Sequence, residues 1–195
     1  MQSFKLIDKK QNPSLGFNAE RYELDEYGSE HIHLKNDSKE IVFMVMFRTI
    51  PESSSVVAHI LEHTTLCGSE NYKVRDPFFM MLRRSMSTFM NAFTASDWTA
   101  YPFATQNKKD FFNLLDVYLD AVYFPILAEE DFKQEGHRIE FSKYDKSNSP
   151  LEYKGVVFNE MKGSMSNIQS ITWQALTKSL FPDLTYRHNL SLIHI

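Results

Sequence analysis

The chain has 195 residues, of which 43% are hydrophobic and 24% are charged, and it carries a formal net charge of −4. This profile is typical of one folded globular domain and excludes a disordered or fibrous chain. The small negative charge, with no stripe of Lys and Arg among aromatic residues, argues against nucleic acid as a partner.

The sequence contains few features that indicate the cellular compartment of the protein. The single cysteine, Cys67, rules out a disulfide framework within the chain and is typical of a reducing compartment. Residues 1–10 resemble neither a signal peptide nor an Arg-rich transit peptide, and no stretch approaches the ~20 apolar residues that a membrane span needs. We therefore expect no membrane partner and a cytoplasmic location, with the mitochondrial or another organelle matrix as the alternative.

The first part of the chain is predicted to form strands and then a helix. Residues 21–34 surround Tyr27-Gly28 and favour a hairpin, and the apolar run IVFMVMF at 41–47 has the length of a buried core strand. A helix is expected from about Val56 to Cys67, because Pro51 and the serines at 53–55 offer a break and cap candidates and Gly68 offers a stop.

The rest of the chain alternates helices with strands. We expect a short helix at 77–84, a hairpin at 88–105, an amphipathic helix from Asp110 that ends at Pro125, a helical segment at 129–141, a polar loop at 143–150, and a helix from about Gly155 as far as Leu180. Hairpins in place of regular crossovers predict an α+β fold, a mostly antiparallel sheet with helices packed on it.

Two histidines and a glutamate carry the main chemical signal. His59, Glu62 and His63 form H-x-x-E-H on the predicted helix, where the histidines project from one face and can share a metal ion. Zinc held by two imidazoles and one carboxylate lowers the pKa of its water to roughly 7, and Glu62 is placed to take the proton. A surface helix with solvated histidines is the alternative, although the apolar neighbours Ile60 and Leu61 argue against full exposure.

A catalytic zinc usually needs a third protein ligand. Spacing does not choose among the four downstream candidates, Glu135, Glu140, Glu152 and Glu160. Glu160 follows the apolar run VVF at 156–158 on a predicted helix, where a buried carboxylate would need a partner, and a metal ion would serve.

Five stretches of the chain carry a family resemblance that extends to about Tyr186. They are AHILEHTTLCGS (Ala58 to Ser69), RDPFFMML (Arg75 to Leu82), STFMNAFTASDWTAYPFATQN (Ser87 to Asn107), DFKQEGHRIEF (Asp131 to Phe141) and KGVVFNEMKG (Lys154 to Gly163). These stretches closely resemble the pitrilysin family of inverted-motif zinc metallopeptidases, and within it the presequence-protease branch.

The resemblance implies one zinc per chain and a role for each residue of the motif. It implies that His59 and His63 are zinc ligands, that Glu62 is the general base and that Glu160 is the third ligand. Other branches carry a glutamate seven residues before the third ligand, where this chain has Tyr153. A supporting carboxylate is therefore either the neighbouring Glu152 or absent.

The resemblance also implies how a substrate is bound. The segment MNAFT at 90–94 would be an edge strand to which an extended peptide adds, with Asn91 and Ala92 as contacts. An ordinary edge strand packed by Phe89 and Phe93 is the alternative for this stretch. The implied activity is a zinc endopeptidase that degrades short, unstructured peptides, and the alternative is a non-catalytic relative that binds peptides or assembles with other subunits.

The resemblance finally bears on the extent of the chain. Enzymes of this branch close two halves of four homologous domains around a peptide, so residues 1–186 match an incomplete N-terminal domain, and the C-terminal domains are expected partners. Residues 187–195 depart from the family pattern, and their ending LSLIHI resembles a translated sequencing adapter, so we expect a non-native or truncated tail. Without the second half, the isolated chain is expected to be weakly active or inactive.

Overall fold

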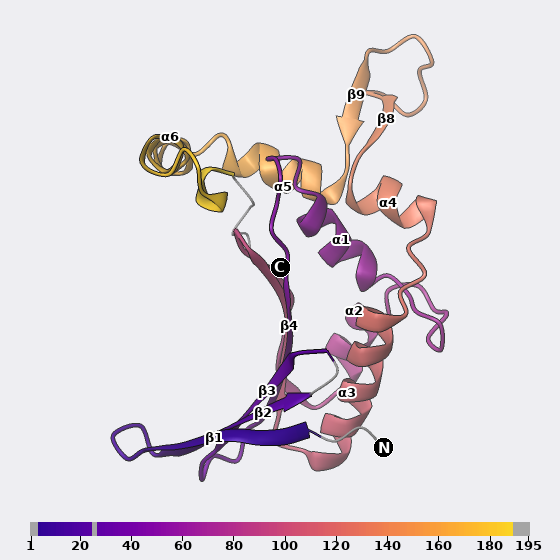
Figure 1. Ribbon diagram of the computed structural model, residues 1–195. Helices are drawn as coiled ribbons and strands as arrows, with labels where there is room; N and C mark the ends of the chain where they lie inside the picture. The colour runs from indigo at the N-terminus through magenta and orange to yellow at the C-terminus, as the bar shows by residue number, and fades with distance from the viewer. Residues whose placement is uncertain (1–3, 25–26, 189–195) are drawn as a thin grey trace. The chain divides into compact units, whose positions relative to one another are not determined.

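The computed structural model describes residues 4–24 and 27–188 and has an α+β architecture (Figure 1). The chain divides into two compact units, Met1–Glu40 and Ile41–Ile195. All strand pairs among the described residues are antiparallel, which confirms the predicted fold class. Residues 189–195, most of the tail that the sequence marks as foreign, lie outside the described residues.

The first unit is a three-stranded sheet in the order β1-β2-β3. Its strands are β1 (Phe4–Asn12), β2 (Phe17–Leu24) and β3 (Ser29–Lys35). The hairpin of β2 and β3 confirms the one predicted at 21–34, and β1 is an addition to the expected elements. Eight of the nine residues of β1 are exposed. Its sequence, FKLIDKKQN, lacks the sustained apolar alternation of a half-buried strand, so this strand was not predicted.

One buried carboxylate joins the three strands of this sheet. Glu20 of β2 is 4% exposed and pairs with Lys35 of β3 at 2.8 Å and with Lys9 of β1 at 3.0 Å. The hydroxyl of Tyr22 donates to the same carboxylate at 2.9 Å. Lys35, Lys9 and Tyr22 hold the pKa of Glu20 down to about 2, so the carboxylate stays ionised at neutral pH.

The second unit contains a four-stranded sheet in which β7 pairs with β4 along one edge and with β5 and β6 along the other. The strands are β4 (Ile41–Arg48), β5 (Ser87–Met90), β6 (Phe93–Thr94) and β7 (Trp98–Thr105). The hairpin predicted at 88–105 is confirmed, but its first arm is interrupted at Asn91 and Ala92. Two short strands therefore stand where a single edge strand was expected.

Strand β4 is partly buried on one face and exposed on the other, which corrects the expectation of a buried core strand. Phe43 and Phe47 pack against the core, whereas Val42 and Met44 on the opposite face are 65% and 53% exposed. Successive side chains of a strand point to opposite faces, and an antiparallel sheet can be covered on one face alone. The run IVFMVMF has no change of polarity that would reveal this.

Six helices and one short 3₁₀ turn occur within residues 27–188. They are α1 (Val57–Thr65), α2 (Pro77–Arg84), α3 (Lys108–Tyr123), α4 (Glu129–Glu135), α5 (Val156–Ser164), α6 (Ile168–Leu180) and η1 (Thr185–Arg187). The predicted helices at 56–67, at 77–84 and from 110 are confirmed as α1, α2 and α3. The serines at 53–55 do not cap α1, because its N-cap is Val56, which makes no side-chain capping bond.

Two segments predicted as single helices are divided in the structure. The segment 129–141 is helical only to Glu135, and its end forms β8 (Arg138–Phe141), which pairs with β9 (Leu151–Lys154) around the predicted loop. Gly136 ends the helix, and the residues after it alternate in burial as a strand does. The segment 155–180 is divided into α5 and α6 because Asn167 caps a new helix, accepting from the Gln169 N–H at 2.8 Å.

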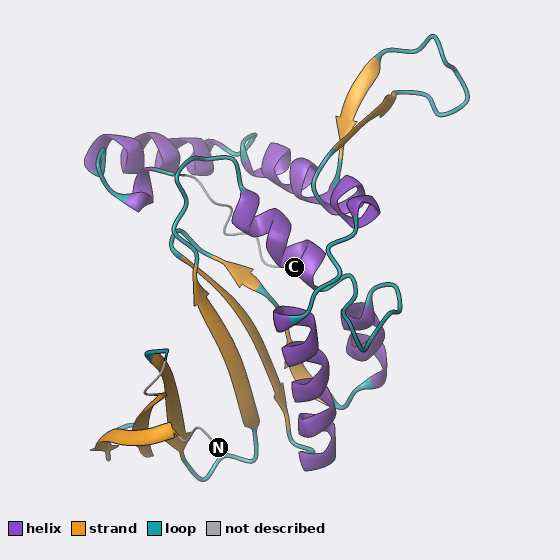
Figure 2. Cartoon of the chain, turned by 45° about the vertical axis from the view of Figure 1, so that its right-hand side comes forward, coloured by secondary structure: helices purple, strands orange, loops and turns teal. Residues whose placement is uncertain are grey.

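The core of the second unit lies between α3 and the sheet (Figure 2). Leu114 and Tyr118 of α3 and Phe103 of β7 are at most 1% exposed, and the rings of Phe103 and Tyr118 lie 5.0 Å apart. Each such side chain contributes roughly 1.5–3 kcal/mol by leaving water. This packing holds β7, and through it β6, in place beside α1.

Candidate metal centre

Helix α1 places the three residues of the motif inside the second unit. His59, Glu62 and His63 are 1%, 2% and 8% exposed, and the two imidazole rings lie 4.9 Å apart. The solvated surface helix that was the alternative is therefore wrong. The spacing of four residues puts the rings on one face of the helix, as the sequence predicts.

Two glycines allow the neighbouring elements to approach α1 closely. A Cβ built on Gly155, just before α5, would lie 2.1 Å from the carbonyl oxygen of Gly136, and one on Gly136 would lie 3.2 Å from a methyl group of Ile60 in α1. The first contact excludes any side chain at Gly155, and the second is tighter than most Cβ contacts. The end of α4 therefore lies next to α1, and the start of α5 lies against the end of α4 (Figure 1).

Helix α5 brings Glu160 to the two histidines. Its Oε2 atom lies 3.5 Å from Nε2 of His59 and 3.8 Å from Nε2 of His63. Among the described residues these three form the one group whose ligand atoms lie within 4.8 Å of one another and could hold a metal ion. Nε2 of His63 and Oε2 of Glu160 are buried with no hydrogen-bond partner, so a cation between them would satisfy both atoms.

The pKa values of the three ligands are shifted in different directions, and only the shift of His59 favours the form that binds a cation. Burial, with His63 nearby, lowers the pKa of His59 to about 4, so its imidazole is a neutral ligand at neutral pH. Burial by itself lowers the pKa of His63, but the carboxylates around it, with Glu135 first, raise it overall. Burial raises the pKa of Glu160, and a divalent ion beside it would favour the ionised carboxylate.

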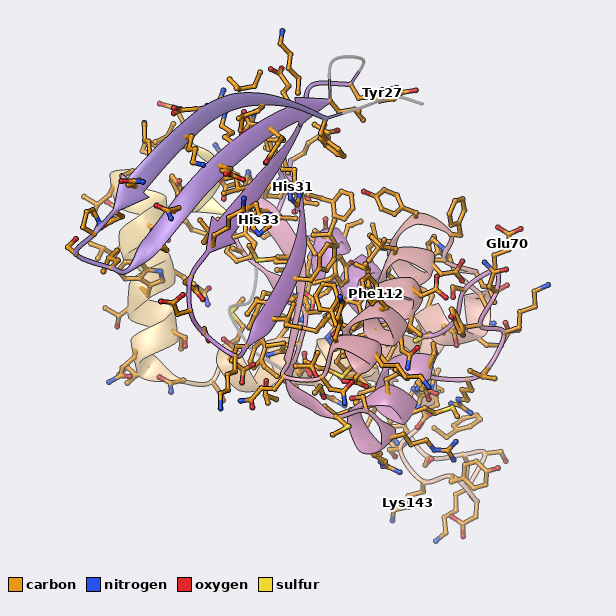
Figure 3. The ribbon with its side chains drawn as sticks, turned by 90° about the horizontal axis from the view of Figure 1, so that it is seen from below. Tyr27, His31, His33, Glu70, Phe112 and Lys143 are labelled. Carbon is orange, nitrogen blue, oxygen red and sulfur yellow. The ribbon has the colours of Figure 1, made fainter. Side chains whose placement is uncertain are left out.

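The other three candidate glutamates do not converge on the two Nε2 atoms. Glu140 and Glu152 lie opposite each other in the β8–β9 hairpin, and Glu140 pairs with Lys154 at 2.8 Å. Glu135 lies beside the other nitrogen of His63, with its Oε2 atom 3.0 Å from Nδ1. His31 and His33 are not part of the H-x-x-E-H motif. They are exposed residues of β3 in the first unit (Figure 3).

A threonine hydroxyl holds the carboxylate of Glu62. Thr94 of β6 donates to Oε2 of Glu62, and its own hydroxyl lies 3.3 Å from that of Thr99, which lies 2.9 Å from that of Thr49. Burial raises the pKa of Glu62, and the bond from Thr94 acts in the opposite direction. Nothing in the residue spacing points to Thr94 in this role, because the contact joins residues 32 positions apart.

Asn91 and Ala92 lie at the interruption between β5 and β6 and are 7% and 0% exposed. The Ala92 N–H donates to the side-chain oxygen of Asn91 at 2.9 Å, and the Asn91 N–H donates to the Pro102 carbonyl at 3.1 Å. The Ala92 N–H is therefore bonded to the neighbouring side chain at the point where the strand is interrupted. Their contact with a substrate stays a prediction.

The fold and the site define the chain as a member of a peptidase family. Residues 51–171 match the family model described as Insulinase (Peptidase family M16), and the chain belongs to this family. It is similar in fold to a crystal structure of pitrilysin, with a TM-score of 0.54 and 18% identity over 67% of this chain and 14% of that one. The resemblance drawn from the sequence motifs is confirmed.

Particular relatives are more similar in sequence. The chain is 55% identical over 174 residues to the mitochondrial presequence protease of Xenopus tropicalis, covering 89% of this chain and 17% of that protein. It is 54% identical over 174 residues to that of Mus musculus, with the same coverage, and 47% identical over 189 residues to that of Schizosaccharomyces pombe, covering 97% and 19%. The chain thus spans less than a fifth of their length. No helix among its described residues is long and apolar enough to cross a membrane.

Proposed function

We propose that this chain carries the zinc site of an endopeptidase that degrades short, unstructured peptides. The observation that supports this most strongly is the convergence of His59, His63 and Glu160, whose ligand atoms lie within 4.8 Å of one another. Two imidazoles and one carboxylate form the donor set of a catalytic zinc with an open position. One zinc per chain would be held by these three residues.

Glu62 is the proposed general base. Zinc in this site would supply a Lewis acid that polarises the scissile carbonyl and acidifies water. Glu62 lies on the same helix between the two histidines, and Thr94 orients its carboxylate. It would take the proton of the attacking water and pass it to the leaving amine, as a positioned carboxylate with a raised pKa can do near neutral pH.

The substrate is proposed to lie along the outer edge of β5 and β6. Asn91 and Ala92 interrupt that edge and are three and two positions from Thr94, which contacts Glu62. An extended peptide bound there by main-chain hydrogen bonds would be recognised with little regard to its side chains. This would suit an enzyme that degrades varied peptides.

The remainder of a longer protein is a proposed partner. The relatives are about six times as long as the part that matches, so we propose that further domains close over the bound peptide and exclude water. The isolated chain would then be a weak catalyst. The relatives' names favour the mitochondrial alternative for its compartment over the cytoplasm.

The ligand set is tested by the zinc content of the purified chain beside three variants. We expect about one zinc in the wild type and in Glu62→Gln, because Glu62 is not a ligand, and little or none in Glu160→Ala. Glu152→Ala is the matched control, since it removes an exposed carboxylate of the β8–β9 hairpin. Equal zinc in all four chains would contradict the proposed ligands.

The reaction is tested with a quenched fluorescent peptide at high chain concentration. Any hydrolysis that depends on zinc should disappear in Glu62→Gln, while zinc content and peptide binding remain. Turnover that survives this substitution would remove Glu62 from the role of base. Peptide binding without turnover in both chains would instead support the non-catalytic alternative for this molecule.

A further inference from the structure

The Nδ1 atom of His63 is hydrogen-bonded to a carboxylate of another helix. Glu135, the last residue of α4, lies with its Oε2 atom 3.0 Å from Nδ1 of His63. The exposed fractions of the two residues are 9% and 8%, so water competes little for this hydrogen bond. The two residues are 72 positions apart, and only the packing of α4 against α1 brings them together.

Glu135 is in turn held by a chain of side chains that reaches the surface. Its second oxygen accepts from Nε2 of Gln134 at 2.8 Å, and Oε1 of Gln134 accepts from the guanidinium of Arg75. An ionised carboxylate only accepts and a guanidinium only donates, so the amide of Gln134 has one orientation that satisfies both neighbours. Both oxygens of Glu135 therefore have a partner, and the carboxylate is held in one position.

This contact determines which nitrogen of His63 faces the site. With an ionised Glu135 beside it, Nδ1 carries the hydrogen and donates it, and in the neutral imidazole this leaves the lone pair on Nε2. That Nε2 atom is buried, has no partner among the described residues, and lies 3.8 Å from Oε2 of Glu160. His59 differs, because its Nδ1 atom is buried without a hydrogen-bond partner in the described part of the chain.

We propose that Glu135 is the positioning residue of this metal centre, which orients His63 and makes Nε2 a stronger ligand. The proposal rests on the zinc site of the proposed function. Position 153, seven residues before Glu160, holds a tyrosine that is 55% exposed, and Glu152 beside it is exposed on β9. Glu135 therefore supplies from α4 the supporting carboxylate that neither of these positions provides.

The first experiment measures zinc affinity of the full 195-residue chain by competition with a chromogenic chelator. Loss of an outer carboxylate typically weakens metal binding by roughly 10- to 100-fold, so we expect that loss in Glu135→Ala and a smaller one in Glu135→Gln, which keeps an oxygen acceptor. Glu140→Gln is the matched control, because it changes a carboxylate of β8 that pairs with Arg138 and Lys154. Wild-type affinity in Glu135→Ala, or an equal loss in Glu140→Gln, would overturn the proposal.

The second experiment uses no metal and reads the imidazole directly. Nitrogen-15 NMR of the metal-free chain at mildly alkaline pH should show His63 with its hydrogen on Nδ1 in the wild type and a mixture of tautomers in Glu135→Ala. An unchanged tautomer in the folded variant would overturn the proposal whether or not the chain binds zinc. If the wild type binds no zinc but the tautomer shifts, the zinc site fails and the positioning by Glu135 stands.

Discussion

Single side chains at the site are held by contacts that residue spacing does not reveal. His59, Glu62 and His63 lie within one short stretch of sequence, and the common face of the two histidines could be predicted from the helical period. Thr94 and Glu135 reach the same residues from a strand and from another helix. Glu135 could be named as a candidate ligand from its residue type, but its hydrogen bond with Nδ1 of His63 depends on how α4 packs against α1.

The hydroxyl of Thr94 gives the first prediction at this scale. Thr94→Val removes the donor to the buried Glu62 while keeping the shape of the side chain, so we expect the free energy of unfolding to fall by roughly 1–3 kcal/mol. Thr94→Ser keeps the hydroxyl and should lose less. Denaturant unfolding of the two variants beside the wild type measures this, and equal losses would show that the hydroxyl contributes nothing.

At the scale of the element, helices α3 and α6 begin in the same way but differ in how they pack. Asn107 and Asn167 are both N-caps, and their side chains accept from two backbone N–H groups and from one, respectively, in the first turn. The helices that they begin differ, since α3 buries six residues against the core and α6 buries none. The cap at Asn167 also explains why one apolar segment became two helices, because a capping side chain can start a new helix within an amphipathic pattern.

This difference predicts unequal effects for the same substitution. Asn107→Ala should lower the free energy of unfolding of the second unit by about 1 kcal/mol, because α3 is part of the cooperative core. Asn167→Ala should leave that transition unchanged and only reduce helix content slightly, because α6 contributes no buried residue to the core. Circular dichroism during denaturant unfolding compares the two, and a larger loss for Asn167→Ala would contradict the assigned packing.

At the scale of the whole molecule, the candidate site lies within one of the two units. All residues of the site belong to Ile41–Ile195. They are the three residues of the motif, the third ligand Glu160, and the supporting residues Glu135 and Thr94. They come from α1, β6, α4 and α5, so the site exists only when those elements are packed. Metal binding and folding of this unit are therefore expected to be linked.

Zinc should stabilise the chain through this linkage. At a free zinc concentration about 100 times the Kd, the free energy of unfolding should rise by about 2.7 kcal/mol, because the folded unit binds the ion and the unfolded chain binds it poorly. A chelator should reverse the shift in thermal unfolding. Glu160→Ala serves as the control and should unfold at the same temperature with and without zinc, and an equal shift in that variant would place the ion elsewhere.

The sequence by itself determined the fold class, the family and the helix that carries His59, Glu62 and His63, because these depend on local periodicity and on motifs of neighbouring residues. Only the tertiary structure decided the one-sided burial of β4, the interruption at Asn91 and Ala92, and the place of Glu135. The burial of β4 and the place of Glu135 depend on contacts between segments far apart in the chain, and the second accompanies the close approach of Gly136 to Ile60 of α1. Such contacts leave no period in the sequence, since they arise only when separate elements pack together.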